Sequence, residues 1–88
     1  MKVILSPQAE KQLKKLSKIN QIAIAKRIRV IRDSTRIEGE EKLKGLQHIF
    51  RIRVGDYRIV YRKTRKQVYI VLIRHREDVY RLIRQLLR

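Results

Sequence analysis

The fold of this chain is decided by the stretch Phe50-Arg51-Ile52-Arg53-Val54-Gly55-Asp56-Tyr57-Arg58-Ile59-Val60-Tyr61. Basic and apolar residues alternate along it, and such alternation gives a strand one cationic and one apolar face. Gly55-Asp56 fits a two-residue turn in which the glycine supplies a positive φ. The stretch therefore predicts one β-hairpin that carries three arginines. Such a surface suits a polyanion, and several cations that converge on one phosphate can also catalyse its transfer.

Apolar patterning predicts further elements on both sides of this hairpin. The expected elements are, in order, a strand at 2–5, helices at 7–16 and 21–34, strands at 49–54, 57–62 and 68–74, and a helix at 79–87. Ser6-Pro7 marks the first helix start, because serine caps helix N-termini and proline fits the first helical position. The acidic stretch 36–45 is expected to be a loop.

These elements predict an α+β fold with the order β-α-α-β-β-β-α. The last three strands form an antiparallel meander, which needs no crossover helix. We expect the N-terminal helical hairpin to pack on this sheet, with the helices on one face and a short helix at the C-terminus. At 88 residues the chain is expected to form a single domain, 1–88.

The charge of the chain points to its partner. There are 24 Lys and Arg against 8 Asp and Glu, which gives a net charge of +16. The basic residues are spread along the whole chain, as in a basic folded domain rather than a basic tail. Nucleic acid is the obvious partner. A membrane surface fits less well because basic residues also lie on the predicted strands, and an acidic protein is compatible with nucleic acid.

Composition also excludes several chemistries. With no cysteine the chain has no disulfide framework and no thiolate zinc site, and two histidines are too few for a histidine-based metal site without help from carboxylates. The eight carboxylates are scattered, which argues against a nuclease with an Asp/Glu-bound metal. We expect no metal and no cofactor. No stretch resembles a signal peptide or a membrane span, so we expect a soluble cytoplasmic protein.

Several polar side chains are candidates for a site on the open face of the predicted sheet. Arg51 and Arg53 lie two residues apart and project from one face of their strand, and Arg58 lies on the paired strand. The other candidates follow the third meander strand; they are His75, Arg76 and Tyr80. For each arginine alone, a solvated surface role is the alternative.

His75 and the basic turn allow more than one interpretation. The unperturbed pKa of histidine is about 6.5, so His75 can move a proton near neutral pH. Histidines near strand ends are, however, often hydrogen-bonded structural groups. A second basic cluster lies around the predicted second turn and consists of Arg62, Lys63, Arg65 and Lys66. For this cluster we expect general electrostatic RNA binding or plain solvation rather than a specific contact.

The chain resembles the RelE/ParE superfamily of small toxins from type II toxin–antitoxin pairs. The resemblance spans nearly the whole chain and is best at Leu43-Lys44-Gly45, at 50–61 and at 74–81. The RelE branch contains metal-independent ribonucleases that cleave mRNA in the ribosomal A site. The ParE branch poisons DNA gyrase and generally lacks the ribonuclease residues.

The resemblance also implies roles for the candidate residues. Arg51 and Arg53 match two basic strand residues of RelE, Arg58 and Arg76 match its phosphate-contacting arginines, and Tyr80 matches its C-terminal tyrosine. This set favours the RelE branch. RelE has lysines where this chain has Arg51 and Arg53, and arginine cannot act as a base. Either His75 or solvent then takes the proton, or charge stabilisation does most of the work.

The resemblance thus implies a ribosome-dependent mRNA endoribonuclease that blocks translation through attack by the ribose 2′-hydroxyl, without a cofactor. Its implied partners are a RelB-like antitoxin, the ribosome and mRNA. The alternatives are a ParE-like gyrase-poisoning toxin without nuclease activity, and a basic RNA-binding domain or toxin fold without catalysis.

Overall fold

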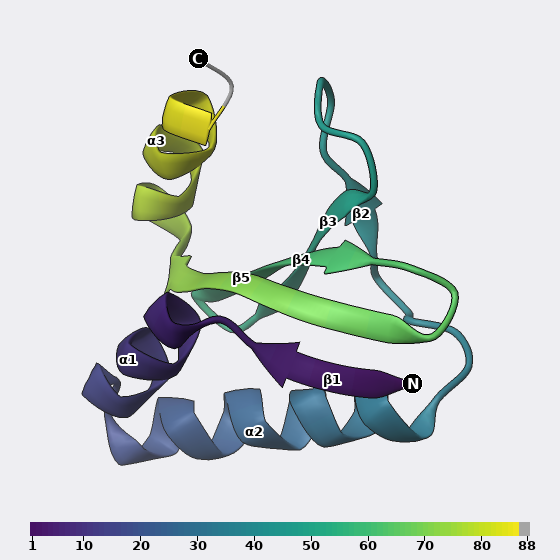
Figure 1. The fold of residues 1–88 in the computed structure, drawn as a ribbon. Helices are drawn as coiled ribbons and strands as arrows, with labels where there is room; N and C mark the ends of the chain where they lie inside the picture. Colours follow the sequence, from purple (N-terminus) through teal and green to yellow (C-terminus); the bar gives the residue numbers. More distant parts are fainter. Residues whose placement is uncertain (87–88) are drawn as a thin grey trace.

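The computed structural model describes residues 1–86, except for the side chains of Tyr80, Ile83 and Leu86 (Figure 1). Its elements are β1 (Lys2–Leu5), α1 (Pro7–Lys15), α2 (Lys18–Asp33), β2 (Glu41–Lys42), β3 (Ile49–Val54), β4 (Tyr57–Lys63), β5 (Gln67–His75) and α3 (Arg76–Leu86). The predicted α+β class and element order are confirmed, with one additional strand, β2, in the region expected to be a loop. None of the helices described is long and apolar enough to cross a membrane.

The strands form one sheet in the order β1-β5-β4-β3-β2. The β3, β4 and β5 strands form the predicted antiparallel meander, and β2 extends it at the edge beside β3. The β1 strand pairs in parallel with β5, at the other edge. The predicted hairpin is also confirmed, because Val54 pairs with Tyr57 and Gly55 takes a φ of 59° in the two-residue turn.

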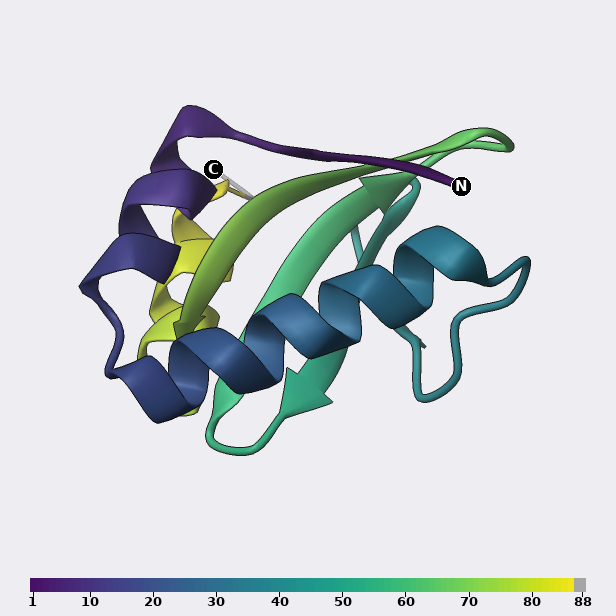
Figure 2. The same cartoon turned by 90° about the horizontal axis from the view of Figure 1, so that it is seen from below.

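The α1 and α2 helices cover one face of this sheet, which we call the helix-covered face. Figure 2 shows α2 crossing the strands on that side. Ile24 and Ile31 of α2 are buried against Ile52 and Ile59 of the hairpin. Burial of these isoleucines is the main source of stability that the sequence pattern predicts, since each buried aliphatic side chain contributes about 1.5–3 kcal/mol.

The third helix covers the opposite face, so the prediction that the helices share one face was wrong. Figure 1 shows α3 rising from the end of β5 on the side away from α2. Val79 of α3 is buried with Val60 and Leu72, together with Leu43 from the segment between β2 and β3. The reason is that neighbouring strand residues project to opposite faces, and the sheet is apolar on both. We call this second face the arginine face, because Arg53, Arg58 and Arg74 lie on it.

Serine caps begin both N-terminal helices. Ser6 Oγ accepts a hydrogen bond from the Ala9 amide at 2.9 Å, as predicted from Ser6-Pro7. The α2 helix starts at Lys18, three residues before the predicted position, because Ser17 caps it and its Oγ accepts from the Asn20 amide at 3.5 Å. This second cap was not predicted.

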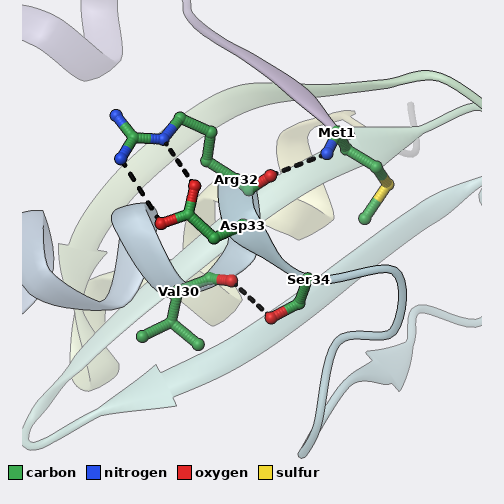
Figure 3. Close-up of polar contacts among 5 residues, drawn as sticks. All are labelled: Met1, Val30, Arg32, Asp33 and Ser34. Atoms are coloured by element: carbon green, nitrogen blue, oxygen red, sulfur yellow. Dashed lines mark hydrogen bonds and ion pairs between the residues drawn. The ribbon is translucent and has the colours of Figure 1, made fainter.

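The C-terminal end of α2 is tied to the start of β1 (Figure 3). The N-terminal ammonium group of Met1 donates to the Arg32 carbonyl at 2.7 Å, where the helix dipole is negative. Ser34 Oγ donates to the Val30 carbonyl at 2.6 Å, which satisfies another carbonyl of the last turn. The contact of Met1 holds the end of the long helix against the edge of the sheet, and that of Ser34 closes the last turn.

We expect Ser6→Ala to destabilise the protein by about 1–2 kcal/mol. Ser6 is 7% exposed, and its hydroxyl also donates to the Val71 carbonyl of β5 at 2.9 Å, so the substitution removes a cap and a tertiary contact together. Ser17→Ala is the matched control and should cost about 0.5 kcal/mol, because its cap is exposed and long. Urea denaturation measures the free energy of unfolding of both variants. Equal losses in the two variants would contradict the tertiary role assigned to Ser6.

Candidate functional site

Three arginines line up side by side across the sheet. Arg53 of β3 pairs with Arg58 of β4, and Arg58 pairs with Arg74 of β5. Paired residues project to the same face, and Arg58 shares its face with Val60, so this arginine row lies on the arginine face. The predicted grouping of Arg51, Arg53 and Arg58 on one face agrees with this register.

Arg58 is the most constrained member of the row. Only 7% of the residue is exposed. Its Nη1 donates to the carbonyl oxygens of Gly55 at 3.1 Å and of Tyr57 at 3.0 Å. Gly55 lies in the hairpin turn and Tyr57 is the first residue after it, so this end of the hairpin sets the direction of the guanidinium group. A guanidinium with five N–H donors and a fixed direction is suited to holding a phosphate.

A carboxylate lies beside these arginines. Glu41 of β2 pairs with Arg51 of β3, and its Oε2 lies 3.0 Å from Arg51 Nη2. Its other oxygen, Oε1, lies 3.7 Å from Arg53 Nε. The hydrogen bond from Arg51 lowers the pKa of Glu41, and the charges of Arg51, Arg53 and Arg58 lower it further. Glu41 is therefore ionised at neutral pH and lies among three candidate phosphate-binding arginines.

Arg76 lies at the same end of the sheet as the arginine row. It is the first residue of α3 and is exposed. Its backbone amide donates to the carbonyl of Asp56 at 2.8 Å, which places it against the hairpin turn that precedes Arg58. Tyr80 also belongs to α3, but its side chain is outside the described part of the chain.

His75 is not brought into the arginine row. It pairs with Tyr57, whose side chain packs on the helix-covered face. The two rings meet edge to face with their centroids 5.7 Å apart. His75 Nδ1 accepts a hydrogen bond from the Glu77 amide at 3.2 Å, at the start of α3. These contacts correspond to the structural alternative for this histidine.

The second basic cluster divides in two. Arg62, Arg65 and Lys66 are exposed. Lys63 instead lies on the helix-covered face, where its ammonium group forms a 2.6 Å ion pair with Glu40. The structure thus gives Lys63 an internal partner and leaves the other three side chains directed to solvent.

Two residues of this site were not predicted, Arg74 and Glu41. Arg74 ends a predicted strand whose apolar run is continuous, so only its pairing with Arg58 places it on the arginine face. Glu41 has no periodic signal either, since it belongs to an acidic stretch without apolar alternation. Within the described residues, no group of three His, Cys, Asp or Glu side chains is placed to hold a metal ion. The side chains that the structure describes at this site are guanidinium groups and one carboxylate.

A comparison with known protein families shows which family this chain belongs to. The sequence model for the ParE toxin of the type II toxin–antitoxin system parDE matches residues 3–80. The chain is a toxin of a type II toxin–antitoxin system and belongs to the ParE toxin family, within the RelE/ParE superfamily that its sequence resembles. No curated protein sequence matches it significantly.

Solved structures share the fold. The RelB-RelE antitoxin–toxin complex from Methanococcus jannaschii matches with a TM-score of 0.78 and 23% identity, over 90% of this chain and 96% of that chain. The isolated RelE toxin of E. coli matches with a TM-score of 0.71 and 23% identity, over 92% of this chain and 97% of that chain. The YoeB dimer of Staphylococcus aureus matches with a TM-score of 0.70 and 24% identity, over 85% of this chain and 95% of that chain. At these identities the likeness establishes the fold.

Proposed function

We propose that this toxin is a ribosome-dependent, metal-independent mRNA endoribonuclease. The observation that carries the proposal is the arginine row with Glu41 beside it on one face of the sheet. Cleavage of RNA by its own 2′-hydroxyl needs stabilisation of a phosphorane-like charge and an acceptor for one proton, and this face offers both. The solved structures named RelE supply the same fold.

The proposed reaction is an in-line attack of the ribose 2′-oxygen on the adjacent phosphorus. The P–O5′ bond breaks, and the products are a 2′,3′-cyclic phosphate and a 5′-hydroxyl. Arg58 and its neighbours in the arginine row hold the phosphate oxygens. Arg76 offsets the charge that develops on the leaving O5′, which takes a proton from water to give the 5′-hydroxyl. Tyr80 is proposed to orient the nucleotide by stacking.

Glu41 is the proposed proton acceptor. Arginine cannot take the proton, and His75 faces the other side of the sheet. A phosphate bound by Arg51 and Arg58 would neutralise part of the field that lowers the pKa of Glu41 in the free protein. Substrate binding would therefore make this carboxylate a better base at the moment it is needed.

A ParE-like gyrase poison is the second candidate, and the family match favours it directly. In that case the arginine face would serve binding only. A non-catalytic RNA-binding domain is the third possibility. For the proposed and the second function we also propose a RelB-like antitoxin as the protein partner, because RelE toxins with this fold were crystallised with RelB.

Primer extension on a defined mRNA in programmed ribosomes tests the proposal. We expect cuts at A-site codons with the wild-type protein, and none when ribosomes are omitted. A gyrase supercoiling assay runs in parallel. Intact mRNA with folded, antitoxin-free protein would overturn the nuclease proposal, and gyrase inhibition would then support the second candidate. If the protein neither cleaves mRNA nor inhibits gyrase, the result supports the third candidate, a non-catalytic RNA-binding domain.

The exposed turn cluster should contribute to ribosome affinity rather than to cleavage. We expect the double variant Arg65→Gln/Lys66→Gln to bind ribosomes more weakly and to reduce the slope of log K against log salt by about 0.7–0.9 for each phosphate that it no longer neutralises. The rate at saturating ribosomes should stay unchanged. Lys11→Gln/Lys15→Gln removes the same charge from α1 and is the control. If the slope of log K against log salt is unchanged in Arg65→Gln/Lys66→Gln, these two side chains are solvated surface residues that do not contact the ribosome.

A further inference from the structure

A buried hydrogen-bonded cluster lies next to β2, on the opposite face from the arginine row. Tyr61 Oη donates to Glu40 Oε2 at 2.5 Å, and Lys63 Nζ lies 2.6 Å from Glu40 Oε1. Both oxygens of the Glu40 carboxylate therefore have a partner on β4. The side chain of Glu40 is only 15% exposed, and Tyr61 is fully buried.

Phe50 packs against this cluster. Its ring stacks on that of Tyr61 with centroids 6.0 Å apart and an angle of 22° between the planes. Lys63 Nζ lies 4.6 Å from the centroid of the same ring, within the range of a cation–π contact. Burial raises the pKa of the Tyr61 hydroxyl, and its hydrogen bond to Glu40 raises it further, so this hydroxyl remains a donor.

The cluster holds the residue immediately before Glu41. Glu40 and Glu41 are neighbours in an extended segment, so their side chains project to opposite sides. Glu40 is held by Tyr61 and Lys63, while Glu41 reaches Arg51 on the arginine face. The position of one carboxylate thus constrains the position of the other.

The β2 strand needs such support because it is short. It consists of two exposed residues, Glu41 and Lys42, which pair only with Arg51 and Phe50. The chain before it is also held by Ile37, which is buried in the core on the helix-covered face, and by Arg27, whose Nη2 donates to the Glu38 carbonyl. Two ladder pairs at a sheet edge resist fraying weakly, and the hydrogen bonds of Glu40 to Tyr61 and Lys63 add to them directly beside Glu41.

We propose that Tyr61 and Lys63 are positioning residues for Glu41: by holding Glu40 on the helix-covered face they fix the Glu41 carboxylate beside Arg51. The effect on cleavage rests on the proposed function, but the positioning itself does not. A purely structural role would stabilise the fold without changing the surroundings of Glu41. The two roles therefore differ in their effect on the pKa of the Glu41 carboxylate.

NMR titration of the Glu41 carboxyl carbon tests the positioning directly. In the wild-type protein its pKa is low because Arg51 donates to the carboxylate. We expect Tyr61→Phe to shift it upward, towards the ordinary glutamate value, in a protein that remains folded. Lys63→Met, at a partly exposed position, should shift it in the same direction and provides a second variant if Tyr61→Phe does not fold. Tyr69→Phe makes the same chemical change on β5 and should leave the titration unchanged.

The outcomes separate this inference from the proposed function. An unchanged Glu41 titration in a folded Tyr61→Phe or Lys63→Met protein would overturn the positioning role, whatever the protein does to mRNA. If the wild-type protein cleaves mRNA, the same variants should lower kcat several-fold with little change in KM. If it does not cleave, the titration shift still supports the positioning and only the nuclease proposal fails.

Discussion

Arg58→Lys should lower the rate of mRNA cleavage on programmed ribosomes by about 10²- to 10³-fold. The substitution keeps the positive charge but removes the planar fork of donors. In the wild-type protein Nη1 is held by the carbonyls of Gly55 and Tyr57, which fixes the direction of the whole guanidinium group. A lysine ammonium cannot keep these contacts and also present paired donors to a phosphate.

Single-turnover primer extension measures this loss, and ribosome binding should change little because the charge is retained. Arg65→Lys is the matched control, since Arg65 is exposed in the turn between β4 and β5 and the variant should cleave at the wild-type rate. A folded Arg58→Lys protein that cleaves within twofold of wild type would remove Arg58 from the reaction.

Glu41→Gln should reduce the cleavage rate by about 10²- to 10⁴-fold, which is the usual contribution of a general base. Ribosome affinity should stay equal or increase, because the substitution removes a negative charge from beside Arg51 and Arg53. A lower rate together with tighter binding separates catalysis from a binding role. Glu38→Gln, at an exposed position in the preceding loop, is the control for the loss of one carboxylate.

The pH dependence of kcat/KM gives an independent check on Glu41. A lowered pKa keeps its carboxylate ionised below the ordinary glutamate value of 4.5. Activity should therefore persist as the pH falls through that value, and be lost only as the pH falls through the lowered pKa. Glu41→Gln should abolish this acid limb. An identical acid limb in the variant would assign it to another group.

Local patterning predicted the hairpin, both N-terminal helices and the meander, because each has a clear period of 2 or 3.6 residues. It failed for β2, whose two residues Glu41 and Lys42 are charged and exposed. They form a strand because β3 offers an unpaired edge. A pairing that depends on a distant strand leaves no periodic signal in the sequence.

The placement of α3 had a similar cause. The apolar run of β5 from Val68 to Ile73 is continuous, so its period does not reveal which residues face which side. A bulge adds to this, since Val60 pairs with Leu72 while Tyr61 pairs with Ile70, and Val71 is left over. The second apolar face thus became visible only with the register.

The candidate site was predicted where it depends on the hairpin alone. The shared face of Arg51, Arg53 and Arg58 follows from alternation around a two-residue turn. Arg74 and Glu41 needed the pairing of β4 with β5 and of β2 with β3. His75 lies near the arginines along the chain, but its register with Tyr57 places it on the other face.

The central position of β4 in the sheet has a further consequence for how this protein can be inhibited. Arg58 lies on a strand whose amides and carbonyls are paired on both sides, and both of its faces are packed. Amide hydrogens of such a strand exchange with solvent only when the whole domain opens. We therefore expect β4 to stay paired when an inhibitor binds, so that an inhibitor acts by competing for the place of the anion rather than by displacing the strand.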